Sequence, residues 1–127
     1  MSRRYLTSSE AEAAIDRGKS VECFLGSCQR DSKPGIKWFS VRASGNGIKV
    51  SVYETADLGN EDFIDIYGFG PLNPDLELED PDEIIEFSSF SEFFSEIEKK
   101  FSGSTSKLVN EFIIQDEYAD YIARGRE

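Results

Sequence analysis

The side chains with the clearest chemical potential are carboxylates concentrated in one stretch. Between Asp75 and Glu86 the chain carries seven Asp and Glu residues, interspersed with Leu, Pro and Ile. A calcium loop beginning at Asp75 would have acids at positions 1, 3, 5, 9 and 12, but its sixth position, which requires Gly, is Asp80, and Pro81 follows. A catalytic carboxylate pair would need a feature that separates it from any acidic loop, and this stretch has none.

Recognition of a basic partner is the third use of this stretch. Acids alternate with leucines from Asp75 to Glu79, so an extended strand or loop would bury Leu76 and Leu78 and expose the carboxylates. A two-residue strand repeat spaces such carboxylates about 6.6 Å apart. The row would resemble a phosphate backbone in charge density and would fit the substrate groove of a nuclease. A solvated edge that discourages strand addition is the alternative.

A second set of candidate contacts lies upstream, where Tyr53 and Tyr67 are interspersed with acids. Tyrosine beside carboxylates is typical of protein interfaces, because Tyr buries a large area at a low cost in side-chain entropy. Ordinary cross-strand pairing is the alternative for these residues. Both sets together form the predicted partner-binding residues: Glu54, Asp62, Asp65, Tyr67, Asp75, Glu77, Glu79, Asp80, Asp82 and Glu83.

The charge of the whole chain favours the same kind of partner. The 127 residues include 14 Lys and Arg against 25 Asp and Glu, for a net charge of −11. Residues 1–50 carry a net +4 and residues 51–127 a net −15, and no Lys or Arg occurs between Lys49 and Lys99. Such a surface attracts cationic proteins and argues against DNA or RNA as the main partner. A solvated acidic surface that only keeps the protein soluble is the simpler interpretation.

Several classes of site are excluded or disfavoured by composition. The absence of histidine excludes Ser-His-Asp triads, Cys-His pairs and His metal ligands. Cys23 and Cys28 are too few for a four-cysteine zinc site, and their odd separation along one strand would point them to opposite faces, so we expect free, buried thiols. We therefore predict no catalytic residue, no metal ligand and no cofactor.

No segment has the character of a membrane span or a signal peptide. The apolar runs fall short of the roughly 18 to 20 residues that a span needs. Arg3 and Arg4 near the start are not followed by an apolar core of the signal-peptide kind. We expect a cytoplasmic protein with no membrane contact.

The first half of the chain predicts one helix followed by an antiparallel meander. A helix is expected over residues 7–18, with Ser8 or Ser9 as its N-cap and Gly18 as its stop. Apolar residues then recur at alternate positions, which is typical of strands. The expected strands are residues 20–27, 36–43, 48–54 and 63–67, and the expected turns are residues 33–35, 44–47 and 58–60.

The second half predicts a further strand and helices. Residues 83–87 form a short apolar strand candidate, and residues 89–101 place Phe90, Phe93, Phe94, Ile97 and Phe101 at helical spacing. We expect this stripe to be core, with Phe94→Ala costing about 3 to 5 kcal/mol. Residues 104–114 and 116–123 are expected to be helical, and residues 117–126 echo residues 10–19 in their Arg-Gly ending.

The predicted fold class is therefore α+β in one domain, residues 1–127. It comprises an antiparallel β-meander of four to six strands, with an N-terminal helix and two to three C-terminal helices packed on it. Trp38, on an apolar strand, is expected to lie in the core.

Three segments carry a resemblance to a known class of proteins: FIDIYGF at residues 63–69, EFSSFSEFFSEIEKKF at 86–101 and NEFIIQDEYADYI at 110–122. The chain resembles the small acidic immunity proteins of bacterial toxin–immunity systems, including contact-dependent inhibition and other polymorphic toxin systems. The resemblance implies a protein that covers the active site of a cognate basic toxin, often a nuclease domain, without turnover. We expect a monomer or weak dimer. Two alternatives are an acidic adaptor or small-ligand-binding module, and an enzyme that uses carboxylates or Tyr.

Overall fold

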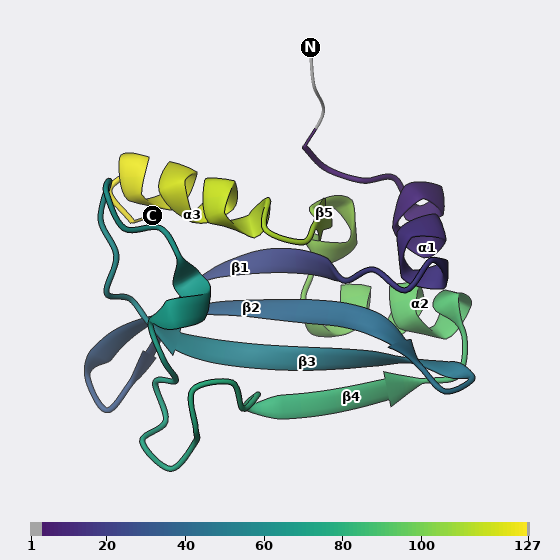
Figure 1. Ribbon diagram of the computed structural model, residues 1–127, viewed down its shortest axis with the longest axis horizontal. Helices are drawn as coiled ribbons and strands as arrows, with labels where there is room; N and C mark the ends of the chain where they lie inside the picture. The colour runs from purple at the N-terminus through teal and green to yellow at the C-terminus, as the bar shows by residue number, and fades with distance from the viewer. Residues whose placement is uncertain (1–3, 127) are drawn as a thin grey trace.

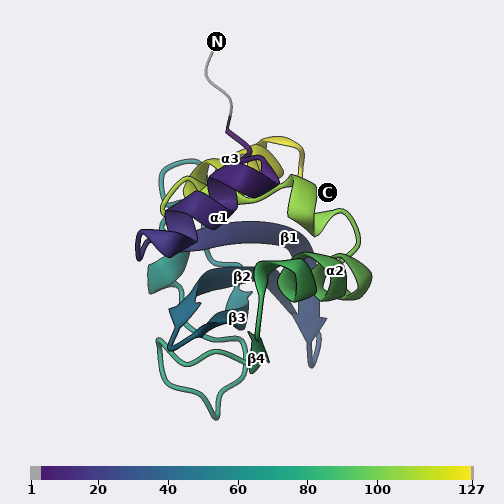
Figure 2. The same cartoon turned by 90° about the vertical axis from the view of Figure 1, so that its right-hand side faces the viewer.

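The computed structural model describes residues 4–126 as one five-stranded antiparallel sheet with helices on both faces (Figures 1 and 2). The strand order is β4-β3-β2-β1-β5. The predicted α+β class is confirmed. The strands are β1 (Val21–Arg30), β2 (Lys33–Ser44), β3 (Gly47–Ala56), β4 (Glu83–Phe87) and β5 (Val109–Asn110). The helices are α1 (Ser8–Asp16), α2 (Phe90–Lys100), α3 (Ile114–Ala123) and the short 3₁₀ turns η1 (Ile66–Gly68) and η2 (Ser104–Ser106).

The central strands are apolar on both sides, which is why both faces of the sheet are covered. In β2, Phe39 and Val41 point to one face and Ile36 and Trp38 to the other, as the alternation predicts. The face that carries Phe39 packs on α1 and α2, and we call it the α1 face. The opposite face packs on α3 and η1, and we call it the α3 face. The sheet therefore lies between two apolar clusters, one on each face.

The α1 face is closed by small residues of α1 and by aromatic residues of α2. Ala11, Ala14 and Ile15 are buried in α1, so this helix lies close to the sheet. In α2, Phe93 and Ile97 are fully buried. Phe94 is half-buried and packs against this core from its margin, as expected of a residue in the apolar stripe. Its position is one residue further around the helix, which turns its ring toward the margin of the core.

Two helix starts follow from capping chemistry. The side chain of Ser89 accepts a hydrogen bond from Glu92 N–H and caps α2. The start of α1 differs from the prediction, because Thr7 is the N-cap. Its hydroxyl accepts from Glu10 N–H at 3.1 Å, and the Glu10 carboxylate accepts from Thr7 N–H at 2.8 Å. Ser8 and Ser9 already belong to the helix.

The first reversal of the sheet lies upstream of its predicted place. Asp31 and Ser32 form the turn with positive φ angles of 51° and 69°. Residues 33–35 belong to β2, so the turn predicted from Pro34 and Gly35 is wrong. Gly35 is needed for a close approach instead, since a Cβ there would lie 2.6 Å from Leu72 Cδ2. The turn predicted at residues 44–47 is confirmed, with positive φ at Gly45.

The segment between β3 and β4 contains no regular strand, although the alternation predicted one at residues 63–67. Phe63 is 65% exposed and makes only an isolated bridge with Asn60, while Ile66, the first residue of η1, is buried on the α3 face. The acid–leucine alternation from Asp75 to Glu79 also forms no strand, and Leu78 is 56% exposed. Alternation alone does not provide a neighbouring strand with which to form hydrogen bonds.

The C-terminal part differs from the prediction in the segment just before α3 and agrees with it at α3. Residues 104–114 were expected to be helical, but they form η2 and then β5, which pairs Val109 with Glu22 of β1. Strand β4 has its predicted bounds, and α3 covers the predicted helix at residues 116–123. Cys23 and Cys28 are free thiols as expected; Cys23 is buried and Cys28 half-buried.

Helix α3 is fixed to the rest of the fold by polar contacts at both ends. Arg4 reaches Glu117 at 2.5 Å near its start, while Tyr118 donates its hydroxyl proton to Asp57 at 2.5 Å. Arg126 beyond the helix pairs with the same Asp57 at 3.0 Å. These contacts hold α3 over β1 and leave a large part of β2 and β3 without a helix above them (Figure 1).

Candidate functional site

Three rows of side chains cross the α3 face from one strand to the next, and they change from aromatic to charged. Residues directly opposite each other in antiparallel strands share a face, so the register defines each row. The rows are Phe24–Trp38–Tyr53, then Glu22–Ser40–Ser51–Ile84, then Arg42–Lys49–Glu86. The small serines of the middle row leave space between larger residues on either side.

The aromatic row is rigid because its polar atoms are paired. Trp38 stacks on Tyr53 with ring centroids 4.4 Å apart, and its indole N–H donates to Thr55 Oγ1 at 2.9 Å. The edge of Tyr67, from η1, meets the Trp38 ring at 5.6 Å. The prediction that Trp38 is a core residue is confirmed, since it is only 5% exposed.

Glu22 is a buried carboxylate in the middle row. It is 2% exposed, and it accepts hydrogen bonds from the Tyr67 hydroxyl at 2.6 Å and from Phe112 N–H at 3.1 Å. Burial raises the pKa of Glu22, and the two hydrogen bonds oppose that rise only in part. Burial and the hydrogen bond to Glu22 also raise the pKa of Tyr67, so Tyr67 remains a donor at neutral pH.

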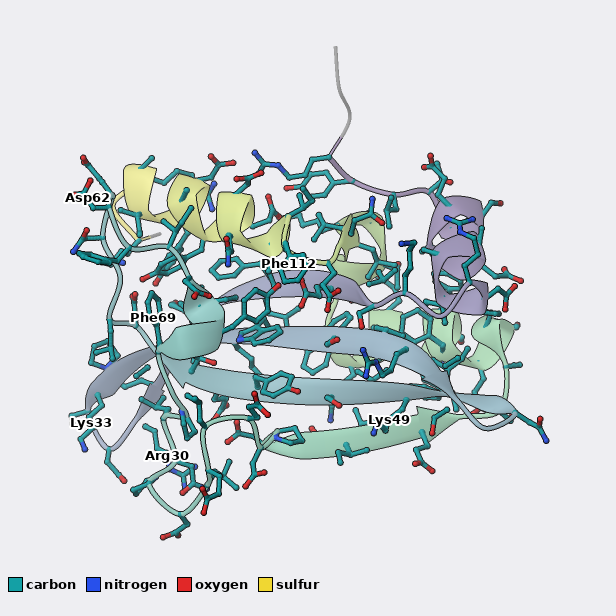
Figure 3. All side chains as sticks on the ribbon, in the orientation of Figure 1. Arg30, Lys33, Lys49, Asp62, Phe69 and Phe112 are labelled. Carbon is teal, nitrogen blue, oxygen red and sulfur yellow. The ribbon has the colours of Figure 1, made fainter. Side chains whose placement is uncertain are left out.

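Phe112 is held in a strained conformation beside this carboxylate. Its φ angle is +77°, a region that bulky residues rarely adopt, and its ring is 61% exposed. The backbone N–H is within reach of both Glu22 and the Tyr67 hydroxyl, and the Tyr67 and Phe112 rings meet edge to face at 5.8 Å. These contacts stabilise the strained turn and present an apolar ring at the margin of the α3 face (Figure 3).

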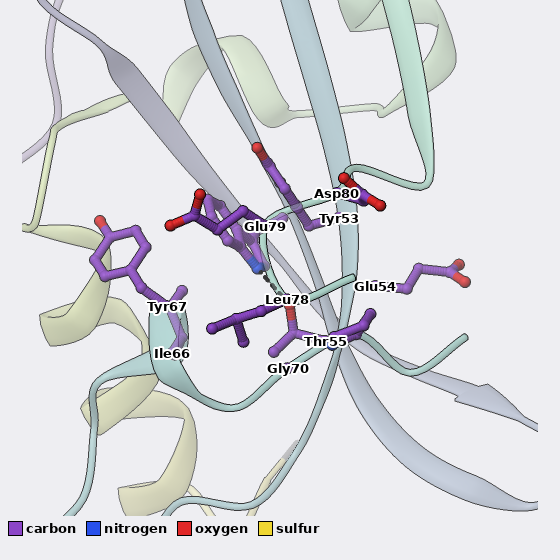
Figure 4. A pocket seen from close by; sticks show the side chains of 11 residues that line it. Tyr53, Glu54, Thr55, Ile66, Tyr67, Gly70, Leu78, Glu79 and Asp80 are labelled. Carbon is purple, nitrogen blue, oxygen red and sulfur yellow. Dashed lines mark hydrogen bonds between the residues drawn. The ribbon is translucent and has the colours of Figure 1, made fainter. Parts of the chain in front are cut away.

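Two adjoining hollows lie over these rows, and we call them together the sheet groove. The first has a volume of about 310 Å³, and its lining includes Trp38, Tyr53, Tyr67 and the loop residues Leu78 and Glu79. Figure 4 shows Leu78 and Glu79 extending from the loop toward Tyr67. The second hollow, of about 370 Å³, shares the three aromatic residues and Glu79 with the first and continues over the serines to the charged row.

The structure places four of the ten predicted partner-binding residues in the lining of this groove. Glu54, Tyr67, Glu79 and Asp80 line the first hollow. Glu54, Asp82 and Glu83 line a separate hollow of about 340 Å³ with Arg30 and Lys37, toward the α1 face, where Glu54 pairs with Lys37 at 3.7 Å. Asp82 has a structural role as well, because its carboxylate accepts from Glu54 N–H at 2.7 Å. Glu83 pairs with Lys100 at 3.3 Å.

The other predicted residues lie further away. Asp75 and Glu77 are exposed on the loop that carries Leu78, outside the lining of the groove. Asp65 lies before η1 and accepts from Gln115 of α3 at 3.3 Å. Asp62 is exposed near the C-terminal end of α3, as Figure 3 shows. The predicted set is therefore spread along one acidic segment, and only part of it surrounds the sheet groove.

Sequence reasoning missed the remaining groove residues, which come from strands expected only to form the sheet. Ile84 is 54% exposed on β4, and Arg42 and Lys49 face each other across β2 and β3. One signal was present: Ser40 and Ser51 interrupt apolar strands at positions that the register places side by side. Nothing local could have joined Glu22 to Tyr67, which lie 45 residues apart.

The composition of the groove includes no cluster of metal ligands. Within residues 4–126, no three Cys, Asp or Glu side chains come together in a way that could hold a metal ion. Over the same residues, no helix has the length and apolar character required to cross a membrane. The chain matches no protein-family model, no curated protein and no solved structure.

Proposed function

We propose that this chain is an immunity protein that binds and neutralises a cognate bacterial toxin domain in the cytoplasm, acting as a monomer or weak dimer. The toxin domain would carry a basic active-site surface, as nucleases do. The observation that carries the proposal is the border of the sheet groove, where exposed apolar residues and carboxylates alternate around an aromatic floor.

Charge would bring the two proteins together. The segment between Lys49 and Lys99 contributes fifteen carboxylates and no base, and its loop at residues 75–82 lines the groove through Leu78, Glu79 and Asp80. A field of one sign raises the association rate with an oppositely charged protein and weakens with salt. The toxin's active site must be basic if it binds a phosphate backbone, so the same acidic loop would compete for that surface.

Apolar residues would then hold the complex. Leu78, Ile84 and Phe112 are 56%, 54% and 61% exposed, and each lines or borders the sheet groove. Burying large apolar side chains at the centre of an interface supplies most of the binding energy in typical complexes. Neutralisation by coverage requires no bond to be made or broken, so the proposed mechanism is steric and electrostatic.

The test begins with identification of the partner. The tagged chain is used to capture proteins from a lysate of the source cells at about 50 and about 500 mM salt, with mass spectrometry of the bound fraction. We expect one basic, near-stoichiometric protein that is toxic when expressed alone and harmless when co-expressed with this chain. A partner whose expression is harmless would contradict the proposal.

Matched charge variants then test the acidic loop. Asp75→Asn, Glu77→Gln and Glu79→Gln together remove three exposed charges, and the loop keeps the hydrogen bonds that the Asp80 and Asp82 carboxylates accept from backbone N–H groups. We expect the association rate at low salt to fall about tenfold. The control Glu12→Gln, Asp16→Asn and Glu96→Gln changes the net charge equally on α1 and α2. An equal effect of both triple variants would exclude the loop from the interface.

A further inference from the structure

We propose that the polar end of the sheet groove is a binding site for a compact oxyanion, carried by a small organic phosphate or carboxylate. The site consists of Arg42 and Lys49 over a floor of serine hydroxyls. It can be tested separately from toxin binding, because the residues that hold the anion lie on the strands and not on the acidic loop.

The first observation is that two neighbouring cations in a strongly acidic chain have no carboxylate partner among the residues that the structure describes. Arg42 and Lys49 stand directly opposite each other across β2 and β3, where like charges destabilise a sheet. In the part of the chain that the structure describes, neither forms an ion pair with a carboxylate, although Glu86 stands opposite Lys49 on β4. A bound anion between the two cations would remove their repulsion.

The second observation is a hollow lined with hydroxyl donors beside the two cations. Ser20, Ser40 and Ser51 line the same 370 Å³ hollow as Arg42 and Lys49. Arg42 Nη2 donates to Ser20 Oγ at 2.9 Å, which fixes the guanidinium near the hollow. Guanidinium, ammonium and hydroxyl groups are the donors that bind phosphate and carboxylate oxygens most strongly, and a guanidinium offers two parallel N–H groups.

The surroundings determine which anions the site can accept. Glu22, Glu79 and Glu111 line the rest of the hollow. Glu22 is already engaged by Tyr67 and Phe112, but Glu79 and Glu111 would repel a long polyanion such as a nucleic acid. A small ligand avoids this repulsion by placing its oxyanion at the cations and its remaining atoms over Tyr53 and Ile84. The expected ligand is therefore a compact monoanion or dianion.

The site is tested with inorganic phosphate and, separately, with acetate, each titrated to about 100 mM at constant ionic strength against chloride. Backbone amide NMR shifts are followed in the wild type, in Arg42→Gln and in Lys49→Gln. The matched control is Arg30→Gln with Lys33→Gln, because these residues form another directly opposed Arg–Lys pair at the end of the β1–β2 hairpin (Figure 3).

In the wild type we expect saturable chemical-shift changes at Ser40, Arg42, Lys49 and Ser51. The affinity for the anion should be at least about tenfold weaker in either groove variant, and the control variant should stay within about twofold of wild type. Saturation by phosphate alone would assign a phosphoryl ligand, and saturation by acetate alone would assign a carboxylate. Shifts that stay linear for both anions, or that survive unchanged in the groove variants, would overturn the site. Dispersed spectra of the variants show that they remain folded.

Discussion

Glu22 links the chemistry of the groove to the stability of the protein. Its carboxylate is buried, yet it holds both the Tyr67 hydroxyl and the N–H group of the strained residue Phe112. A positive φ at a bulky residue costs about 1 to 3 kcal/mol, so these hydrogen bonds must offset the strain. One side chain therefore fixes the position of an exposed aromatic ring that borders the proposed interface.

The raised pKa of Glu22 predicts a specific pH dependence. The folded protein binds this proton at a higher pH than the unfolded chain, whose Glu titrates near 4.5, so ionisation of Glu22 destabilises the fold as pH rises through the raised pKa. We expect Glu22→Gln to be most favourable relative to wild type at pH 7 and to lose that advantage as pH falls toward 4.5. The difference should change by up to about 1.4 kcal/mol per pH unit.

Urea unfolding of both proteins at several pH values between about 4.5 and 8 measures this difference. Glu12→Gln on the exposed side of α1 is the matched substitution, since it makes the same chemical change away from the groove. If the stability difference between Glu22→Gln and wild type stays constant over this range, burial does not raise the pKa of the Glu22 carboxyl group.

The start of α1 shows how one hydroxyl decides where a helix begins. Thr7 and Glu10 satisfy each other's backbone N–H groups, whereas Ser8 lies inside the first turn. We expect Thr7→Ala to lower the free energy of unfolding by about 1 kcal/mol. Ser8→Ala should be neutral or slightly stabilising, because Ala has the higher helix propensity. Chemical denaturation of the two variants checks the assignment, and a greater loss at Ser8 would place the cap there instead.

The two ends of the chain show which local signals are reliable. Residues 10–19 and 117–126 share an Arg-Gly ending. In both, the Gly just beyond the helix lies in the left-handed region, at φ +83° for Gly18 and +75° for Gly125. The strand alternation of β2 is equally informative, because it places Phe39 and Trp38 on opposite faces of the sheet. Such signals depend only on neighbouring residues, so the sequence alone reveals them.

The elements that escaped prediction depend on distant partners. Residues 63–67 alternate like a strand, but Tyr67 is drawn into η1 by Trp38 and by the hydroxyl bond to Glu22. Strand β5 has only two residues and exists because Val109 finds an open edge of β1. The candidate site was only partly predicted for the same reason: the acids were visible in the sequence, whereas the groove beside them needed the register of β1, β2, β3 and β4.

The two cores of the molecule share the same three strands, so they should unfold together. Each of the strands β1, β2 and β3 contributes side chains to both clusters. Loss of packing on the α1 face must therefore loosen the strands that hold the α3 face. The single tryptophan, Trp38, lies on the α3 face and reports on it by fluorescence.

This coupling predicts the effect of a substitution on the far side of the sheet. Phe93→Ala removes a fully buried ring from the α1 face and should lower the free energy of unfolding by about 3 to 5 kcal/mol. We expect the unfolding midpoint seen by Trp38 fluorescence to fall together with the midpoint seen by far-UV circular dichroism. Phe94→Ala, at the half-buried neighbouring position, should shift both midpoints less, and Phe93→Leu provides a milder variant. A Trp38 transition that stays in place while the circular dichroism transition moves would mean that the two faces unfold independently.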